Sequence, residues 1–208
     1  SPHFPGMRLL EQEQIAQIEP KVVEGREEEI VALATENETS GVDFNALARS
    51  FVEQAHAVAD ERIELQLGTE VKKIIPTAHG YHLRTDNGEL HADFVVVSAG
   101  GHSLLHAQRL GYGLEYSCLP IAGSFYYTPQ VLNGKVYTVQ NPKLPFAAIH
   151  GDPDIVEQGK TRFGPTALAL PLLERHNLRT FTEYLEVLRP DMDVAKVFFD
   201  LLKEGEIR

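Results

Sequence analysis

Two side chains in the second half of this 208-residue chain could do acid–base and anion-binding chemistry. His150 closes the apolar stretch Phe146–His150 and precedes a Gly-Asp-Pro turn. An imidazole titrates near neutral pH, as a general base must. Arg162 could bind a carboxylate through two parallel hydrogen bonds. On the residues alone, a histidine that ends a strand is more often a hydrogen-bonded structural residue, and an ordinary surface arginine explains Arg162 equally well.

The other polar clusters have simpler interpretations. His102 and His106 lie four residues apart on a predicted helix, a spacing that can bind zinc. No third ligand lies nearby in the sequence, so we expect both on a solvated helix surface and no metal site. The acidic run Glu27–Glu29 is likewise expected to be solvated. Three further histidines lack the spacing of metal ligands: His79, His82 and His91.

Composition limits the class of function. The chain is 43% hydrophobic and 24% charged, which is typical of a soluble globular protein that buries a core. Its net charge of −11 argues against a nucleic-acid partner. A single cysteine, Cys118, favours a reducing compartment, and no signal peptide or long apolar run is present, so we expect a cytoplasmic protein. The chain lacks an initiator Met and ends without a capping residue, and we therefore expect a fragment.

The chain is organised around the stretch His91–Leu110. Phe94–Val97 is continuously apolar, which is typical of a strand buried on both faces. A tight turn, Ala99 to Gly101, then leads into a predicted helix. Turns of this kind lie at the strand ends where open α/β sheets bind nucleotides. An ordinary strand-to-helix turn is an equally good interpretation.

The patterns before this stretch predict two helices and a meander. A short helix is expected around Glu11–Ile18, and a longer amphipathic one from Phe44 to about Asp60, with Asp43 as its N-cap. Alternation predicts strands at 30–35, 63–67, 71–75 and 80–85, and a hairpin turn at Asp86-Asn-Gly88 that leads into a fourth meander strand through His91.

The second half predicts an antiparallel sheet followed by helices. Strands are expected at 121–128, 135–140, 146–150 and 161–169, and amphipathic helices at 171–188 and 191–204. Tyr126 and Tyr127 alternate along the first of these strands, so only one of them can face a site on the sheet.

These segments resemble known flavoenzymes. Gly41–Leu47, Glu64–Ile74 and Asn87–Gly101 are similar to the middle of FAD-dependent oxidoreductases of the D-amino-acid-oxidase-like superfamily. The second half narrows the resemblance to malate:quinone oxidoreductases and L-2-hydroxyglutarate oxidases, through Pro120–Tyr127, Asn141–His150 and Arg162–Leu168. The order and spacing of the motifs carry the resemblance, which covers roughly residues 40–170.

The resemblance implies an α/β fold, of which this chain is an α+β fragment. The fragment has three parts. Residues 1–40 would form a lead-in, residues 41–110 part of the FAD-binding domain, and residues 111–208 the substrate-binding sheet and C-terminal helices. The family's N-terminal Gly-x-Gly-x-x-Gly unit has no match here, and neither does its C-terminal glycine-containing segment. We therefore expect FAD in the full-length protein but not held tightly by this chain alone.

The resemblance also implies residue roles. The Val71 backbone would meet the adenine edge, Ala99 and Gly100 would let the main chain approach the ribose-pyrophosphate, and Gly164 would shape the turn beside the flavin. His150 would be the catalytic base, and Arg162 and Tyr126 would bind substrate.

The implied reaction oxidises a 2-hydroxy acid, malate to oxaloacetate, and passes electrons to quinone. Delivery to quinone implies peripheral contact with the inner membrane, for which the C-terminal helices are candidates. Two alternatives stay open: an L-2-hydroxyglutarate or amino-acid oxidase of the same superfamily, and a cofactor-free binding module.

Overall fold

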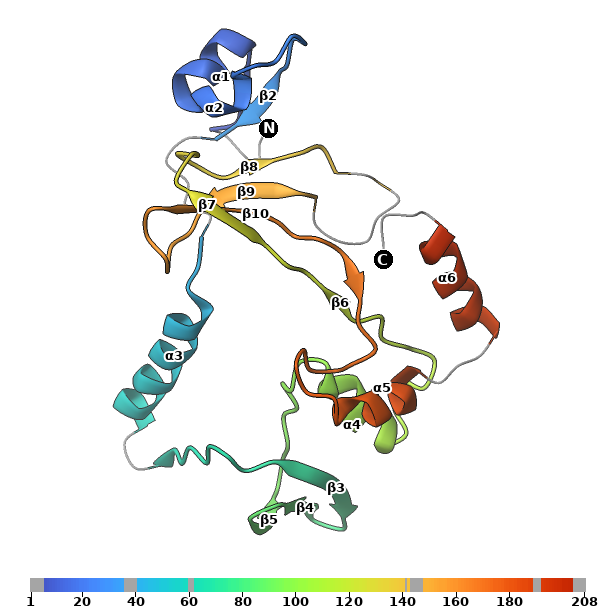
Figure 1. The fold of residues 1–208 in the computed structure, drawn as a ribbon. Helices are drawn as coiled ribbons and strands as arrows, with labels where there is room; N and C mark the ends of the chain where they lie inside the picture. The colour runs from blue at the N-terminus through green and yellow to red at the C-terminus, as the bar shows by residue number, and fades with distance from the viewer. Residues whose placement is uncertain are drawn as a thin grey trace. The chain divides into compact units, whose positions relative to one another are not determined.

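The computed structural model describes residues 6–35, 41–59, 62–140, 142, 148–188 and 192–203 (Figure 1). The chain divides into two compact units, one of residues 1–62 and 123–166, the other of residues 63–122 and 167–208. Each unit combines helices with antiparallel strands, so the α+β character is confirmed. The three segments predicted from the sequence, 1–40, 41–110 and 111–208, have other boundaries than these two units. The functional roles of the three segments stay a prediction.

The centre of the first unit is a four-stranded antiparallel sheet in the order β7-β10-β9-β8. Its strands are β7 (Tyr126–Pro129), β8 (Val136–Tyr137), β9 (His150–Pro153) and β10 (Lys160–Gly164). The predicted antiparallel layer is therefore confirmed, although its strand boundaries differ. The strand predicted at 121–128 is divided into β7 and a short strand at 121–122 in another sheet, and the one predicted at 135–140 covers only Val136–Tyr137. His150 begins its strand instead of ending one, and residues 146 and 147 lie outside the described residues. The strand predicted at 161–169 breaks after Gly164, because Pro165 has no N–H to continue the ladder.

One face of this sheet packs tightly against its own loop. Thr161 is fully buried, and its hydroxyl accepts hydrogen bonds from the backbone N–H groups of Val131 (3.0 Å) and Leu132 (3.2 Å). The Phe163 ring lies so close to Gly151 that an added Cβ would come within 2.6 Å of it. This face therefore holds the sheet together, which leaves the opposite face for other side chains.

Within the first unit, a buried carboxylate joins the N-terminal segment to the loop between β7 and β8. The segment comprises β1 (Arg8–Leu10), α1 (Gln12–Ile18), α2 (Pro20–Val23) and β2 (Ala32–Ala34), so the predicted helix and strand are confirmed, the strand being shorter than predicted. Glu19 is 7% exposed and accepts hydrogen bonds from the backbone N–H groups of Asn133 (2.9 and 3.0 Å) and Gly134.

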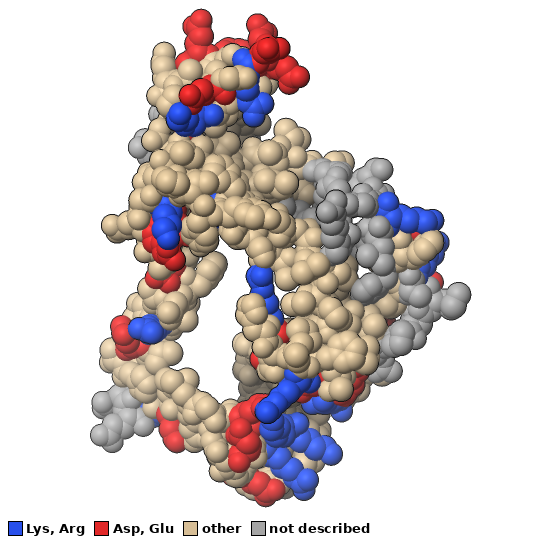
Figure 2. All heavy atoms as spheres, viewed as in Figure 1, with Lys and Arg blue, Asp and Glu red and all other residues tan. Residues whose placement is uncertain are grey.

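Acidic side chains gather over the α1–α2 region in Figure 2. Glu27, Glu28 and Glu29, in the loop that follows α2, are all exposed, as predicted for a solvated run. Like charges close together favour water over a packed interior, which explains why this loop stays at the surface.

The amphipathic helix is α3 (Phe44–Ala59). Asp43 caps it as predicted, because its Oδ1 accepts hydrogen bonds from the N–H groups of Asn45 (2.9 Å) and Ala46 (3.1 Å). Its apolar side chains are nevertheless exposed, with Phe44 at 76% and Phe51 at 63%.

The second unit contains the three-stranded meander β3-β4-β5, formed by β3 (Val71–Thr77), β4 (Gly80–Thr85) and β5 (Gly88–Ala92). The predicted hairpin is confirmed, because Thr85 pairs with Gly88 across the turn. The strand predicted at 63–67 is wrong. These residues run instead into a turn whose Gly68 carbonyl accepts a hydrogen bond from Asn87 Nδ2 (3.1 Å). A side-chain contact thus replaces the expected ladder.

The buried strand predicted at Phe94–Val97 is also wrong. β5 ends at Ala92, and the following run belongs to no strand, with Phe94 78% and Val96 77% exposed. A strand requires a hydrogen-bonded neighbour, and within the described ranges none pairs with this run. The turn and helix after it are confirmed: Gly100 has φ +55°, and α4 (His102–Arg109) follows.

The rest of the second unit comprises β6 (Ile121–Ala122), which pairs with β11 (Leu168–Ala169), and the helices α5 (Thr180–Leu188) and α6 (Met192–Lys203). In this part of the unit, α4 contacts α5. The helix predicted from residue 171 begins only at Thr180, whereas α6 matches its prediction across residues 192–203. Among the described residues, no helix has the length and apolar character needed to cross a bilayer.

Candidate functional site

The register of the four-stranded sheet brings several predicted site residues onto one face. Gly164 pairs with His150, and Tyr137 pairs with His150 from the other side. Arg162 pairs with both Asp152 and Tyr127. Directly opposed residues of antiparallel strands project to the same side, and so do residues two apart. This face, called the polar face below, carries Tyr127, Tyr137, His150, Asp152 and Arg162.

His150 is held by one hydrogen bond and two rings. It is 9% exposed, and its Nδ1 lies 3.0 Å from the carbonyl oxygen of Ala148. The Tyr137 ring centroid lies 4.8 Å away and that of Phe125 5.5 Å away in an edge contact. When Nδ1 donates its proton to that carbonyl, Nε2 carries the lone pair of the neutral ring. The arrangement thus provides an oriented proton acceptor.

Arg162 is already occupied by carboxylates of the chain itself. Its Nε lies 3.2 Å from both oxygens of Asp152, and its Nη2 lies 3.0 Å from Oδ2 of the same group. Its Nη1 is 3.6 Å from Oδ2 of Asp154. The hydrogen bond to Asp152 raises the pKa of the Arg162 guanidinium. A role for Arg162 in binding substrate stays a prediction, but little of the guanidinium is free for a second carboxylate.

Asp154 completes this cluster. Its Oδ1 accepts hydrogen bonds from the backbone N–H groups of Glu157 (2.6 Å) and Val156 (2.8 Å), and the Tyr127 hydroxyl lies 3.3 Å from its Oδ2. These bonds, chiefly the one from Glu157, lower the pKa of Asp154. Two buried carboxylates therefore face one guanidinium.

Tyr126 does not join the polar face. It pairs with Phe163, whose ring covers Gly151 on the packed face, and its side chain is 70% exposed. Its neighbour Tyr127 occupies the position beside Arg162 instead. The prediction that only one of the two tyrosines faces the site is confirmed. The strand register, which the sequence does not give, places Tyr127 on the polar face and Tyr126 on the opposite face.

Gly164 fills a position that cannot accept a side chain. A Cβ added there would lie 2.7 Å from the backbone oxygen of Ser124 and 2.9 Å from the Phe125 ring. Because Gly164 pairs with His150, this close approach also fixes the backbone beside the imidazole.

Three predicted cofactor residues lie in the second unit. Asp86 N–H donates to the Glu70 carbonyl (3.2 Å), so Val71 and Thr85 form a non-hydrogen-bonded pair. The backbone of Val71 therefore points outward from the edge strand β3, as recognition of an adenine edge would require. Gly100 has open space where a Cβ would be, whereas the Ala99 N–H already donates to Ser103 Oγ (2.9 Å).

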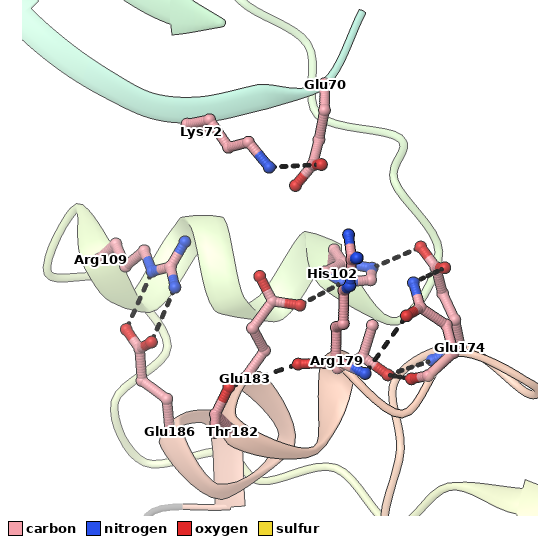
Figure 3. Close-up of polar contacts among 11 residues, drawn as sticks. Glu70, Lys72, His102, Arg109, Glu174, Arg179, Thr182, Glu183 and Glu186 are labelled. Atoms are coloured by element: carbon pink, nitrogen blue, oxygen red, sulfur yellow. Dashed lines mark hydrogen bonds and ion pairs between the residues drawn. The ribbon is translucent and has the colours of Figure 1, made fainter. Parts of the chain in front are cut away.

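The helix after this turn is fixed by ion pairs to α5 and its preceding loop (Figure 3). His102 Nε2 lies 3.0 Å from Glu183 Oε2, and Arg109 binds Glu186 through two hydrogen bonds of 2.9 and 2.7 Å. The expectation of a solvated surface is wrong for His102, which is 18% exposed, and for the half-buried His106, whose pKa is lowered chiefly by burial. In the described part of the chain, no group of three or more potential ligands could hold a metal ion.

Sequence reasoning missed part of the polar face. Asp152 and Asp154 follow His150 at intervals of two residues, which is the period that places side chains on one face of a strand. Applied from His150 outward, this period would have found both aspartates. Lys135 and Tyr137 have the same spacing at the start of β8, but their place on this face depends on the pairing of Tyr137 with His150, which local periodicity does not give.

Comparisons with known proteins agree on the family. The family model described as malate:quinone oxidoreductase (Mqo) matches residues 1–190. A probable malate:quinone oxidoreductase of Helicobacter pylori (strain P12) is 45% identical over 213 residues, which are 99% of this chain and 47% of the relative. A probable malate:quinone oxidoreductase of Campylobacter jejuni is 44% identical over 216 residues, covering 99% of this chain and 48% of that protein. The chain thus spans about half the length of these curated relatives.

Two solved structures share the fold. Glycine oxidase from Geobacillus kaustophilus aligns with a TM-score of 0.58 at 18% identity, over 91% of this chain and 48% of that one. L-proline dehydrogenase from P. horikoshii aligns with a TM-score of 0.52 at 16% identity, over 88% and 48%. On the sequence match to its family model and to its curated relatives, this chain belongs to the malate:quinone oxidoreductase family.

Proposed function

We propose that this chain supplies the substrate face of an enzyme that oxidises malate to oxaloacetate, with FAD as cofactor and quinone as electron acceptor. The observation that carries the proposal is the geometry of His150. It is an oriented, nearly buried imidazole on a face that it shares with Tyr127, Tyr137 and Arg162. Family membership supplies the reaction class.

The residues of the chain would perform the proton chemistry. His150 Nε2 accepts the proton of the substrate hydroxyl while the Ala148 carbonyl holds the ring in the required tautomer. Tyr137 and Phe125 restrict the motion of the imidazole and exclude water from its flanks. FAD, when bound, supplies the two-electron acceptor.

Of the four residues predicted to hold the cofactor, three lie in the second unit and one in the first. The outward backbone of Val71 suits the adenine edge, and the open Gly100 position lets the main chain approach a phosphate closely. Ala99 belongs to the same turn, and Gly164 lies beside His150. These features fit a dinucleotide, and they support FAD as the cofactor of the complete protein, although not tight binding by this chain alone.

The partners follow from the reaction. A quinone acceptor is lipid-soluble, so we propose peripheral contact with the inner membrane from the cytoplasmic side. The net charge of −11 is unfavourable for a nucleic-acid partner.

The test is an absorption spectrum of the protein purified from its complete reading frame. We expect a flavin absorption band at about 450 nm. Under anaerobic conditions, L-malate should bleach this band, and L-2-hydroxyglutarate should bleach it only weakly. Bleaching by L-2-hydroxyglutarate or an amino acid alone would assign the corresponding oxidase reaction instead. A folded protein without any flavin band would favour the cofactor-free binding module.

A further inference from the structure

The cations near the polar face differ in what they contact. Arg162 is bound by Asp152 and Asp154, as described above. Lys160 pairs with Glu157, and its Nζ lies 5.6 Å from the centroid of the Tyr127 ring. Both cations therefore have an anionic partner of their own. Their charge is neutralised before any substrate arrives.

Lys135 is different. It is half-buried, and its Nζ lies 5.1 Å from the centroid of the Tyr137 ring, which in turn is 4.8 Å from the His150 ring. Among the described residues, no carboxylate pairs with it. An ammonium group held over an aromatic ring has no anionic counterion there, and it keeps N–H donors for a second ligand. Among the described side chains of this face, Lys135 is thus a cation without a carboxylate partner, one ring away from the candidate base.

We propose that Lys135 binds a carboxylate of the substrate, so that the site selects 2-hydroxy acids with two carboxylates over those with one. This inference rests on the proposed function, because it assumes that His150 faces the substrate hydroxyl. A dicarboxylate that places its hydroxyl at His150 extends a charged end along Tyr137 toward Lys135. A monocarboxylic 2-hydroxy acid has only one charged end, which leaves the ammonium without a partner.

The experiment compares Lys135→Met with the wild-type enzyme, both prepared from the complete reading frame. We expect kcat/KM for L-malate to fall roughly 10- to 100-fold, mostly through KM, as is typical when one charged hydrogen bond is lost. The kcat/KM for L-lactate should stay within about twofold, because that substrate lacks the second carboxylate. Lys135→Arg keeps the charge and should recover most of the KM for L-malate.

Lys160→Met is the matched control, because it removes a lysine that contacts a tyrosine ring but is already paired. It should leave the KM for L-malate unchanged. A Lys135→Met enzyme with the same KM as this control would overturn the proposal, and so would an equal loss toward L-lactate.

Succinate binding provides a readout that does not depend on turnover. Calorimetry should show weaker succinate binding to Lys135→Met by the same factor as the rise in KM. If the wild-type enzyme oxidises no 2-hydroxy acid, the proposed function fails. The succinate titration still decides whether Lys135 binds a dicarboxylate, and unchanged affinity in Lys135→Met would refute that.

Discussion

Replacement of Arg162 by methionine tests the ionic cluster that anchors the polar face. The substitution removes the guanidinium that contacts both Asp152 and Asp154, whose side chains are each 5% exposed. Removing one partner of a buried ion pair typically costs about 3–5 kcal/mol, because a desolvated charge loses its counterion. Arg162 itself is 29% exposed, and Asp154 keeps its backbone donors, so we expect a smaller loss, about 2–3 kcal/mol of unfolding free energy.

The assay is urea denaturation followed by circular dichroism, and Lys21→Met is the control in the same unit. Lys21 pairs with Glu24 at the surface, where both side chains are more than half exposed, so its loss should cost less than about 0.5 kcal/mol. The double variant Asp152→Asn/Arg162→Met removes both charges and should recover part of the stability. The reasoning is refuted if Arg162→Met unfolds at the same urea concentration as the control.

Three further predictions concern the same sheet. His150→Gln should lower kcat for L-malate by about 10²- to 10⁴-fold at unchanged flavin content, and steady-state kinetics with a spectrum of each preparation would check this. Gly164→Ala should cost about 1–3 kcal/mol in urea denaturation, because its Cβ would meet the Ser124 backbone oxygen; unchanged stability would disprove that close contact. Backbone hydrogen bonds lower the pKa of Asp154 in the folded state. The ionised Asp154 therefore stabilises the folded protein fully above the ordinary aspartate pKa, and this contribution to the unfolding free energy is lost as the pH falls through the lowered pKa. Unfolding free energies measured from pH 5 down to about 2 should therefore decline less in Asp154→Asn than in the wild type.

Sequence patterns correctly predicted the elements that are determined by residues close together in the chain. The Asp43 cap needs only the next three residues, and the Asp86-Asn-Gly88 turn fixes its own hairpin. The prediction at Phe94–Val97 failed because an apolar run becomes a strand only beside another strand. Propensity along the chain does not report that neighbour.

The sequence was sufficient to choose candidate residues by their chemistry, but it was not sufficient to predict the strand register that brings them together. His150 was chosen by its chemistry, and the sheet does place it with Arg162 on one face. The choice between Tyr126 and Tyr127 depends on cross-strand pairing, and a shift of one residue exchanges the two faces. His102 was predicted at the surface because its partner Glu183 lies 81 positions further along the chain. Contacts at that separation leave no trace in local periodicity.

Charge balance is the physical basis of the specificity proposed for the polar face. If malate is the substrate, as proposed, a dianion approaches a chain of net charge −11, so the attraction must come from a local cation. Arg162 cannot supply it freely, since Asp152 and Asp154 together carry one more negative charge than the guanidinium neutralises. That surplus repels a carboxylate at the Arg162 end of the face. In the proposal, Lys135, held over Tyr137 one ring away from His150, attracts one at the other end. If His150 and Lys135 have the proposed roles, the same sheet favours one orientation of a dianion, with its hydroxyl at the imidazole and its second carboxylate directed away from the aspartates.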